Sequence, residues 1–214
     1  RALISARDKG GVLVTLCSAC HHVLKRVNDD LARNEEIRNK VNTYLEVKEP
    51  YQGETKVLHF LEVLRDQVGF AKLAQLVTHP LTGQQIGAYY GCMLLRPSKV
   101  LAFDDPENPQ LLEQFLQALG ATPVRYGMRN ECCTGYMAVT NPGLCKQMVG
   151  EILQSARDEE AQALITACPL CRYNLVVNAS PAQKLPVYYF TELLARALGV
   201  PVEPAAAEQS GGEG

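Results

Sequence analysis

Cysteines carry the chemistry that the sequence suggests first. The chain has 214 residues and eight cysteines. Seven of them form two C-x-x-C motifs, one adjacent pair and one single position, and an eighth lies apart: Cys17 and Cys20, Cys168 and Cys171, Cys132 and Cys133, Cys92, and Cys145. In a reducing compartment this grouping favours metal ligation over disulfide bonds. Cys145 lies among apolar residues and is expected to be buried rather than to bind metal.

The first C-x-x-C motif is followed directly by His21, which gives the attachment pattern of a c-type haem. An internal repeat argues against a haem. Residues 13–24 (LVTLCSACHHVL) align with residues 164–175 (LITACPLCRYNL), so Arg172 stands at the position of His21 and cannot be an axial ligand. A thioredoxin-like dithiol is also disfavoured, because it would not need the distant adjacent pair.

The repeat continues in residues 57–64 (VLHFLEVL) and 187–194 (VYYFTELL), each an apolar pair followed by an amphipathic helix. Each C-x-x-C motif therefore lies where a buried strand ends and a helix begins, near the positive end of the helix dipole. His59 aligns with Tyr189 and is expected to be a packing residue. A helix cap or a surface position is expected for His21.

Strand-like and helix-like segments alternate in the second half of the chain. Strands are expected at 86–91, 122–125 and 163–166, and helices at 110–119 and from 141 to about 160. This order predicts an α/β fold with a mainly parallel sheet, in which ligand sites collect at the carboxyl ends of the strands. Five cysteines should converge there: Cys92, Cys132, Cys133, Cys168 and Cys171.

The number of sulfur atoms bears on the metal. A structural zinc site uses four ligands, which would leave one of the five thiols spare. Adjacent cysteines also chelate a single small ion poorly, whereas they can bind different irons of a polynuclear cluster. The sequence therefore favours iron–sulfur over zinc, although thiolate suits both metals.

The order Cys92, Cys132-Cys133, Cys168-Pro-Leu-Cys171 has 39 and 34 intervening residues. It resembles the cysteine-rich CCG domain of the B-type subunits of heterodisulfide reductase. That resemblance implies two tandem, similar α/β domains with mainly parallel sheets: the remainder of a first domain in 1–80 and a complete second domain in 81–202. About sixty amino-terminal residues of the first domain would be missing. One departure is that Thr134, not glycine, follows the cysteine pair.

The same resemblance implies a noncubane 4Fe-4S cluster held by Cys92, Cys132, Cys133, Cys168 and Cys171. Cys17 and Cys20 would belong to a second, incomplete site, for which zinc is an alternative. In the family, two clusters face each other across a cavity where a disulfide such as CoM-S-S-CoB is split. Electrons arrive from an iron–sulfur C-type subunit and a flavin-containing A-type subunit.

The function implied is that of the catalytic iron–sulfur subunit of a disulfide-reducing oxidoreductase complex. Two alternatives remain open. The chain could be a non-catalytic assembly subunit whose cysteines bind zinc, or a related CCG-domain oxidoreductase that acts on a hydroxy acid.

Composition excludes several other classes. The chain has 21 basic and 23 acidic residues and a net charge of −2, so it offers no basic surface for nucleic acid. No signal peptide or long apolar run is visible, which predicts a cytoplasmic protein without direct membrane insertion. No nucleotide-binding glycine motif occurs, so electrons should come from another protein. The charged segment 28–49 is expected to form an exposed helix, and residues 203–214 a disordered tail.

Overall fold

The computed structural model describes residues 1–201, so the predicted tail at 203–214 lies outside the described residues. The larger of two sheets has the strand order β4-β3-β5-β6. Every strand pair in it is parallel, which confirms the predicted α/β class. Its strands are β3 (Gln85–Tyr89), β4 (Thr122–Val124), β5 (Ala163–Thr166) and β6 (Val187–Tyr189).

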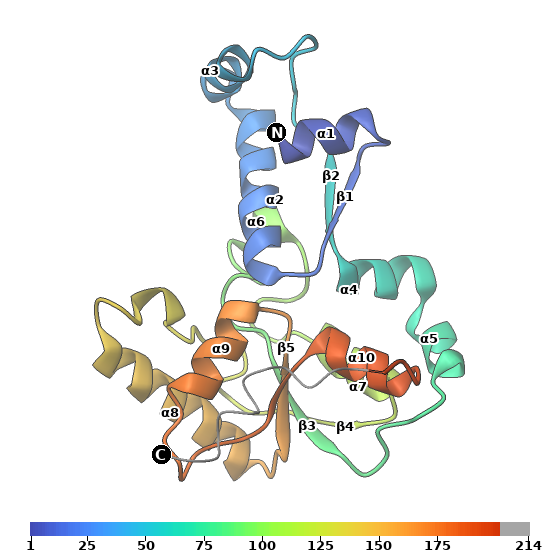
Figure 1. The fold of residues 1–214 in the computed structure, drawn as a ribbon, viewed down its shortest axis with the longest axis vertical. Helices are drawn as coiled ribbons and strands as arrows, with labels where there is room; N and C mark the ends of the chain where they lie inside the picture. Colours follow the sequence, from blue (N-terminus) through green and yellow to red (C-terminus); the bar gives the residue numbers. More distant parts are fainter. Residues whose placement is uncertain (202–214) are drawn as a thin grey trace.

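Helices cover both faces of this sheet (Figure 1). Ile86 of β3 and Ile165 of β5 pack in one core cluster with residues of three helices, and Tyr89 and Leu164 pack in a second cluster on the opposite face. A strand that is buried on both faces reads as a continuous apolar run, as β5 does. The helices on the two faces are α5 (Phe70–Leu76), α7 (Leu111–Ala118) and α10 (Phe190–Ala197), and α8 (Pro142–Asp158) and α9 (Pro169–Val177).

The smaller sheet has two parallel strands, β1 (Val12–Thr15) and β2 (Lys56–His59). It stands at the upper end of Figure 1 beside α1 (Ala2–Asp8), α2 (Ser18–Arg33) and α3 (Glu35–Leu45). One face packs against α1 and α2. Helix α3 has no buried residue, which confirms an exposed helix in the charged segment.

The connection between the two sheets packs against the larger one. It consists of α4 (Phe60–Val63), the π-helix η1 (Leu64–Val68) and α5. Leu61, Leu64 and Leu73 of this connection are buried in the core cluster that contains Ile86 and Ile165. The larger sheet is therefore stabilised in part by residues that precede its first strand.

The sequence repeat corresponds to a repeated local structure. Strand β2 leads into α4 and strand β6 into α10, each through a capping box. Glu62 Oε2 accepts from the His59 amide at 2.7 Å, and Glu192 Oε2 accepts from the Tyr189 amide at 2.7 Å. The aligned residues therefore perform the same task at the two helix starts.

Candidate metal centre

Five cysteines from three distant segments meet at the carboxyl edge of the larger sheet. Cys92 follows β3, Cys132 and Cys133 lie in the loop before the short 3-10 helix η2 (Gly135–Met137), and Cys168 and Cys171 open α9. Because β3 and β5 are neighbouring parallel strands, their carboxyl ends lie side by side. The predicted convergence is therefore what this topology produces.

The thiols approach each other in pairs. Cys92 Sγ lies 3.5 Å from Cys132 Sγ, and Cys133 Sγ lies 3.4 Å from Cys171 Sγ. The Cys171 thiol is also hydrogen-bonded to Cys168. Within residues 1–201, no three His, Cys, Asp or Glu side chains are arranged to hold a single metal ion. The assignment of the five thiols as ligands of one group remains a prediction.

The hydrogen bonds between thiols separate their pKa values. The Cys92 thiol donates to Cys132, which lowers the pKa of Cys132 to about 6 and raises the pKa of Cys92. The Cys171 thiol lowers the pKa of Cys168 to about 7, with help from backbone amides at the start of α9, and its own pKa is raised. Thiolate is the form that binds metal, so the pairing prepares anionic sulfur in a partly buried site.

The third lowered pKa belongs to Cys133. Its main cause is the hydrogen bond from the Cys171 thiol, followed among the lowering contacts by the Gly135 amide and the Asn174 side chain. The Thr134 amide donates to Cys132 Sγ at 3.3 Å. Backbone amides therefore point at both sulfurs of the adjacent pair, as they do at many anion and iron–sulfur sites.

A glycine leaves room beside the thiols. Gly91 has a φ of 63°, and a Cβ at this position would lie 3.3 Å from Cys171 Sγ. A side chain here would strain the backbone and crowd the sulfur. The soft thiolate donors, the amides directed at them and this open cradle fit an inorganic sulfide cluster.

The loops that carry Cys92 and Cys132 are tied to each other. The Tyr90 amide donates to the Arg129 carbonyl at 2.8 Å, and the Tyr89 hydroxyl donates to the Glu131 carbonyl at 2.8 Å. Arg96 donates to the Asn130 carbonyl at 3.3 Å. These bonds fix the backbone on both sides of the cysteines, so Arg96 is not the freely solvated side chain that its position after Cys92 suggested.

The first C-x-x-C motif abuts the second. The Ser18 amide and hydroxyl both donate to the Ala167 carbonyl, at 2.9 and 2.7 Å. The Tyr189 hydroxyl bridges the carbonyls of Leu16 and Ala167, which precede the two motifs. The start of α2 therefore lies against the strand end that carries Cys168.

Cys17 and Cys20 complete the set of predicted site residues. Cys17 Sγ accepts from the Cys20 amide at 3.3 Å and so caps α2. Cys17 is half-buried and Cys20 is exposed. The structure thus brings this motif next to the five-cysteine cluster, whereas both motifs keep their own sulfur pairs.

The prediction of a cap or surface role for His21 is wrong. His21 is fully buried and lies 3.7 Å from Glu62, between Nε2 and Oε2. Burial lowers the pKa of His21 to about 4. At the aligned position Arg172 contacts Glu192 at 3.2 Å, so the two copies keep the contact with different residues. The expectation that His59 is a packing residue is confirmed, since it is fully buried.

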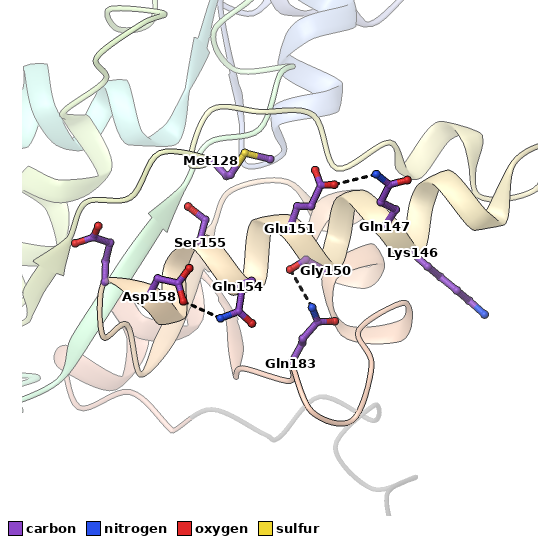
Figure 2. A pocket seen from close by; sticks show the side chains of 10 residues that line it. Met128, Lys146, Gln147, Gly150, Glu151, Gln154, Ser155, Asp158 and Gln183 are labelled. Atoms are coloured by element: carbon purple, nitrogen blue, oxygen red, sulfur yellow. Dashed lines mark hydrogen bonds between the residues drawn. The ribbon is translucent and has the colours of Figure 1, made fainter.

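A surface groove of about 700 Å³ runs along α8 and is bordered by Met128 and Gln183 (Figure 2). Its polar side chains bond to neighbours on the same helix, as Gln154 does to Asp158 at 2.7 Å. None of the cysteines is among its lining residues. The groove contributes nothing to the cysteine cluster.

Two contributors to the cluster escaped the sequence reasoning, Gly91 and Asn174. Their positions offered a signal: Gly91 directly precedes Cys92, and Asn174 lies three residues after Cys171 on the same helix face. A polar residue within an otherwise apolar helix stripe is the kind of exception that marks a site.

Known proteins resemble the chain in the same region and beyond. Residues 86–176, which contain all five converging cysteines, match the cysteine-rich CCG domain. The chain is 31% identical to the 8-methylmenaquinol:fumarate reductase membrane anchor subunit of Wolinella succinogenes, over 95% of the chain and 73% of that protein. It is 30% identical to a protein of Archaeoglobus profundus that is named as like the B-type subunit of heterodisulfide reductase, over 96% and 73%.

A further relative is the B-type subunit of the ferredoxin/F420H2-dependent CoB-CoM heterodisulfide reductase of Methanosarcina acetivorans, with 28% identity over 98% of the chain and 73% of the relative. The matches run through both C-x-x-C motifs rather than through the CCG segment alone. The chain therefore belongs to the family of CCG-domain proteins that includes the B-type subunits of heterodisulfide reductase and the 8-methylmenaquinol:fumarate reductase anchor subunit.

Proposed function

We propose that the chain is the catalytic iron–sulfur subunit of a heterodisulfide-reductase-like oxidoreductase complex and reduces a small disulfide such as CoM-S-S-CoB or an analogue. One observation carries the proposal. Thiols from three segments separated by more than thirty residues meet at one sheet edge, with Sγ–Sγ distances of 3.4 and 3.5 Å. Two of the relatives carry heterodisulfide reductase in their names.

The group proposed for this site is a noncubane 4Fe-4S cluster held by Cys92, Cys132, Cys133, Cys168 and Cys171. When bound, it would supply Lewis-acidic iron and one electron at a time. The chain's own residues provide anionic sulfur, because the pKa values of Cys132 and Cys168 are about 6 and 7. The backbone amides hold that charge, and the surrounding loops keep the sulfurs half-buried or buried.

Cys17 and Cys20 would supply two thiols of a second site. Its nearness to the first supports the proposal, since the Ser18 amide bonds directly to the residue before Cys168. A disulfide offers two sulfur atoms, and two neighbouring thiol-rich sites can each receive one. Zinc is the alternative occupant of this pair.

The proposed partners are a C-type iron–sulfur subunit and a flavin-containing A-type subunit, which would deliver the electrons. No helix within the described residues combines the length and apolar character needed to cross a membrane. The proposal includes neither a nucleic-acid partner nor direct insertion of this chain into a membrane.

Metal analysis tests the proposal. Anaerobically prepared protein is expected to contain iron and inorganic sulfide at about four each per five-cysteine site. Cys132→Ser and Cys133→Ser should abolish this loading, whereas Cys145→Ser should retain it, because Cys145 is buried outside the thiol pairs. Stoichiometric zinc without iron, or full iron content in Cys132→Ser, would contradict the assignment and favour the assembly subunit.

A second function is favoured by the 31% identity to the fumarate reductase anchor subunit. In that case the same cluster would pass electrons between a quinol-linked partner and a fumarate-reducing one, without a disulfide substrate. Reoxidation of the reduced, iron-loaded protein by a heterodisulfide separates the two. Rapid bleaching by the disulfide supports disulfide reduction, and its failure while a quinone analogue reoxidises the protein supports the second function.

A further inference from the structure

Asn174 is a buried amide within the cysteine cluster. It lies on α9 with 1% of its surface exposed. Its Nδ2 donates to the Cys133 carbonyl at 2.5 Å. A buried amide is retained at a cost unless its donors and acceptors are used, so this contact explains why a polar side chain occupies an apolar environment.

Two donors fix the orientation of this amide. The Cys145 thiol donates to Asn174 Oδ1 at 2.9 Å, and Asn178 Nδ2 donates to the same oxygen at 2.6 Å. Since both partners of Oδ1 are donors, the amide nitrogen must face Cys133. Cys145, the one cysteine outside the predicted groups, thereby acquires a specific neighbour.

The backbone that Asn174 holds adopts a tight path. Thr134, directly after Cys133, has a φ of 56° in the left-handed region. A Cβ on Gly135 would lie 3.4 Å from Cys133 Sγ and 3.5 Å from Asn174 Cβ. The loop therefore runs close against α9, and the Asn174 amide is the side chain that anchors it there.

The repeat shows that the helix itself does not require this amide. Val23 aligns with Asn174 in the first copy and is 57% exposed, although α2 forms a regular helix around it. The asparagine is thus a feature of the complete cysteine cluster and not of the strand–cysteine–helix unit.

We propose that Asn174 and Cys145 form a positioning unit that holds the Cys132-Cys133 loop, so that Cys133 Sγ faces Cys171. The Cys145 thiol orients the Asn174 amide, and the amide fixes the Cys133 carbonyl. Neither residue is a ligand. The inference rests on the proposed function only where it treats Cys133 as a ligand, because the contacts belong to the protein alone.

The test is the accessibility of Cys133 in the purified full chain without added iron. A short pulse of iodoacetamide followed by peptide mass spectrometry gives the labelling of Cys133 relative to Cys168. Asn174→Asp replaces the donor with an acceptor, and Cys145→Ala removes the orienting thiol. Both variants are expected to raise the Cys133/Cys168 labelling ratio about tenfold, as loss of one buried hydrogen bond allows.

Two variants separate positioning from general packing. Val149→Ala removes volume from α8 one turn away, at a side chain as fully buried as Cys145. Cys145→Ser keeps a donor at the same position. Both are expected to leave the labelling ratio within about twofold of the parent, since the amide stays oriented.

Equal labelling ratios in Cys145→Ala and Val149→Ala would overturn the proposal, even if Asn174→Asp failed to fold. Equal increases in Cys145→Ser and Cys145→Ala would also overturn it. Absence of iron from the parent protein would instead count against the proposed function, because the labelling is measured without iron.

Discussion

The adjacent cysteines 132 and 133 face different partners, Cys92 and Cys171. Neighbouring side chains diverge along an extended backbone, so one residue pair reaches two sides of a site. The left-handed Thr134 that follows then turns the chain into η2. This divergence is the reason that an adjacent pair suits a group with several metal atoms better than a single ion.

Buried histidines should make the protein sensitive to acid. Burial lowers the pKa of His21 to about 4, whereas an unfolded histidine titrates near 6.5. Between these values the unfolded state binds a proton that the folded state does not, so stability falls as the pH drops below about 6.5. At pH 4.5, His21 alone should cost about 2–3 kcal/mol of unfolding free energy relative to pH 7.5.

Urea denaturation of His21→Gln at both pH values measures this contribution. The variant should lose less stability than the parent on acidification, whatever its stability at pH 7.5. His79→Gln is the control, because His79 is exposed. The prediction is contradicted if His21→Gln and the parent lose the same free energy between the two pH values.

Among the elements, the start of α2 is held against the end of β5 by few but direct bonds. In the second copy Pro169 has no amide hydrogen to return the bond that the Ser18 amide gives. The Tyr189 hydroxyl satisfies the Leu16 carbonyl instead and also reaches the Ala167 carbonyl. The two strand ends are therefore joined through one side chain of β6.

Tyr189→Phe tests this junction. Loss of the hydroxyl should lower the unfolding free energy by about 1 kcal/mol, the usual net value of a partly buried hydrogen bond. It should also speed hydrogen exchange at the Ser18 amide, which shares the Ala167 carbonyl. The neighbouring Tyr188→Phe is the matched control, since the Tyr188 hydroxyl has no hydrogen-bond partner among residues 1–201. Identical behaviour of the two variants would argue against a bridging role.

Across the entire fold, the two sheets differ in how well they are covered. Val12 and Leu16 are each 51% exposed on the open face of the two-stranded sheet, whereas the aligned Ala163 and Ala167 are 7% and 2% exposed in the larger sheet. A sheet of two strands with one open face is marginally stable by itself. Its order depends on α1, α2 and the junction at β5.

Hydrogen exchange should report this difference directly. Amides paired between β1 and β2 are expected to exchange at least about tenfold faster than those paired between β3 and β5, because less apolar surface protects them. Exchange measured by mass spectrometry on the full chain at neutral pH gives both rates. Equal protection in the two sheets would show that the smaller sheet is stabilised by something beyond the described contacts.

Much of this architecture was readable from local patterns. Apolar runs located the strands that end at Cys92 and Cys168, and helical spacing located α7 within one residue at each end. The alignment of His59 with Tyr189 predicted equivalent helix starts, and both carry capping boxes. These features depend on short-range periodicity and on backbone rules that any segment obeys wherever it lies.

Contacts between distant segments were not readable in this way. The pairing of Cys132 with Cys92, the burial of His21 against Glu62 and the hold of Asn174 on Cys133 all depend on loop paths and sheet register. A residue's type and spacing report which face of its own element it occupies, but not which other element meets that face. The amino-acid order thus fixed where cysteines could gather, and the folded chain alone set which sulfur faces which, because those distances arise from packing between elements.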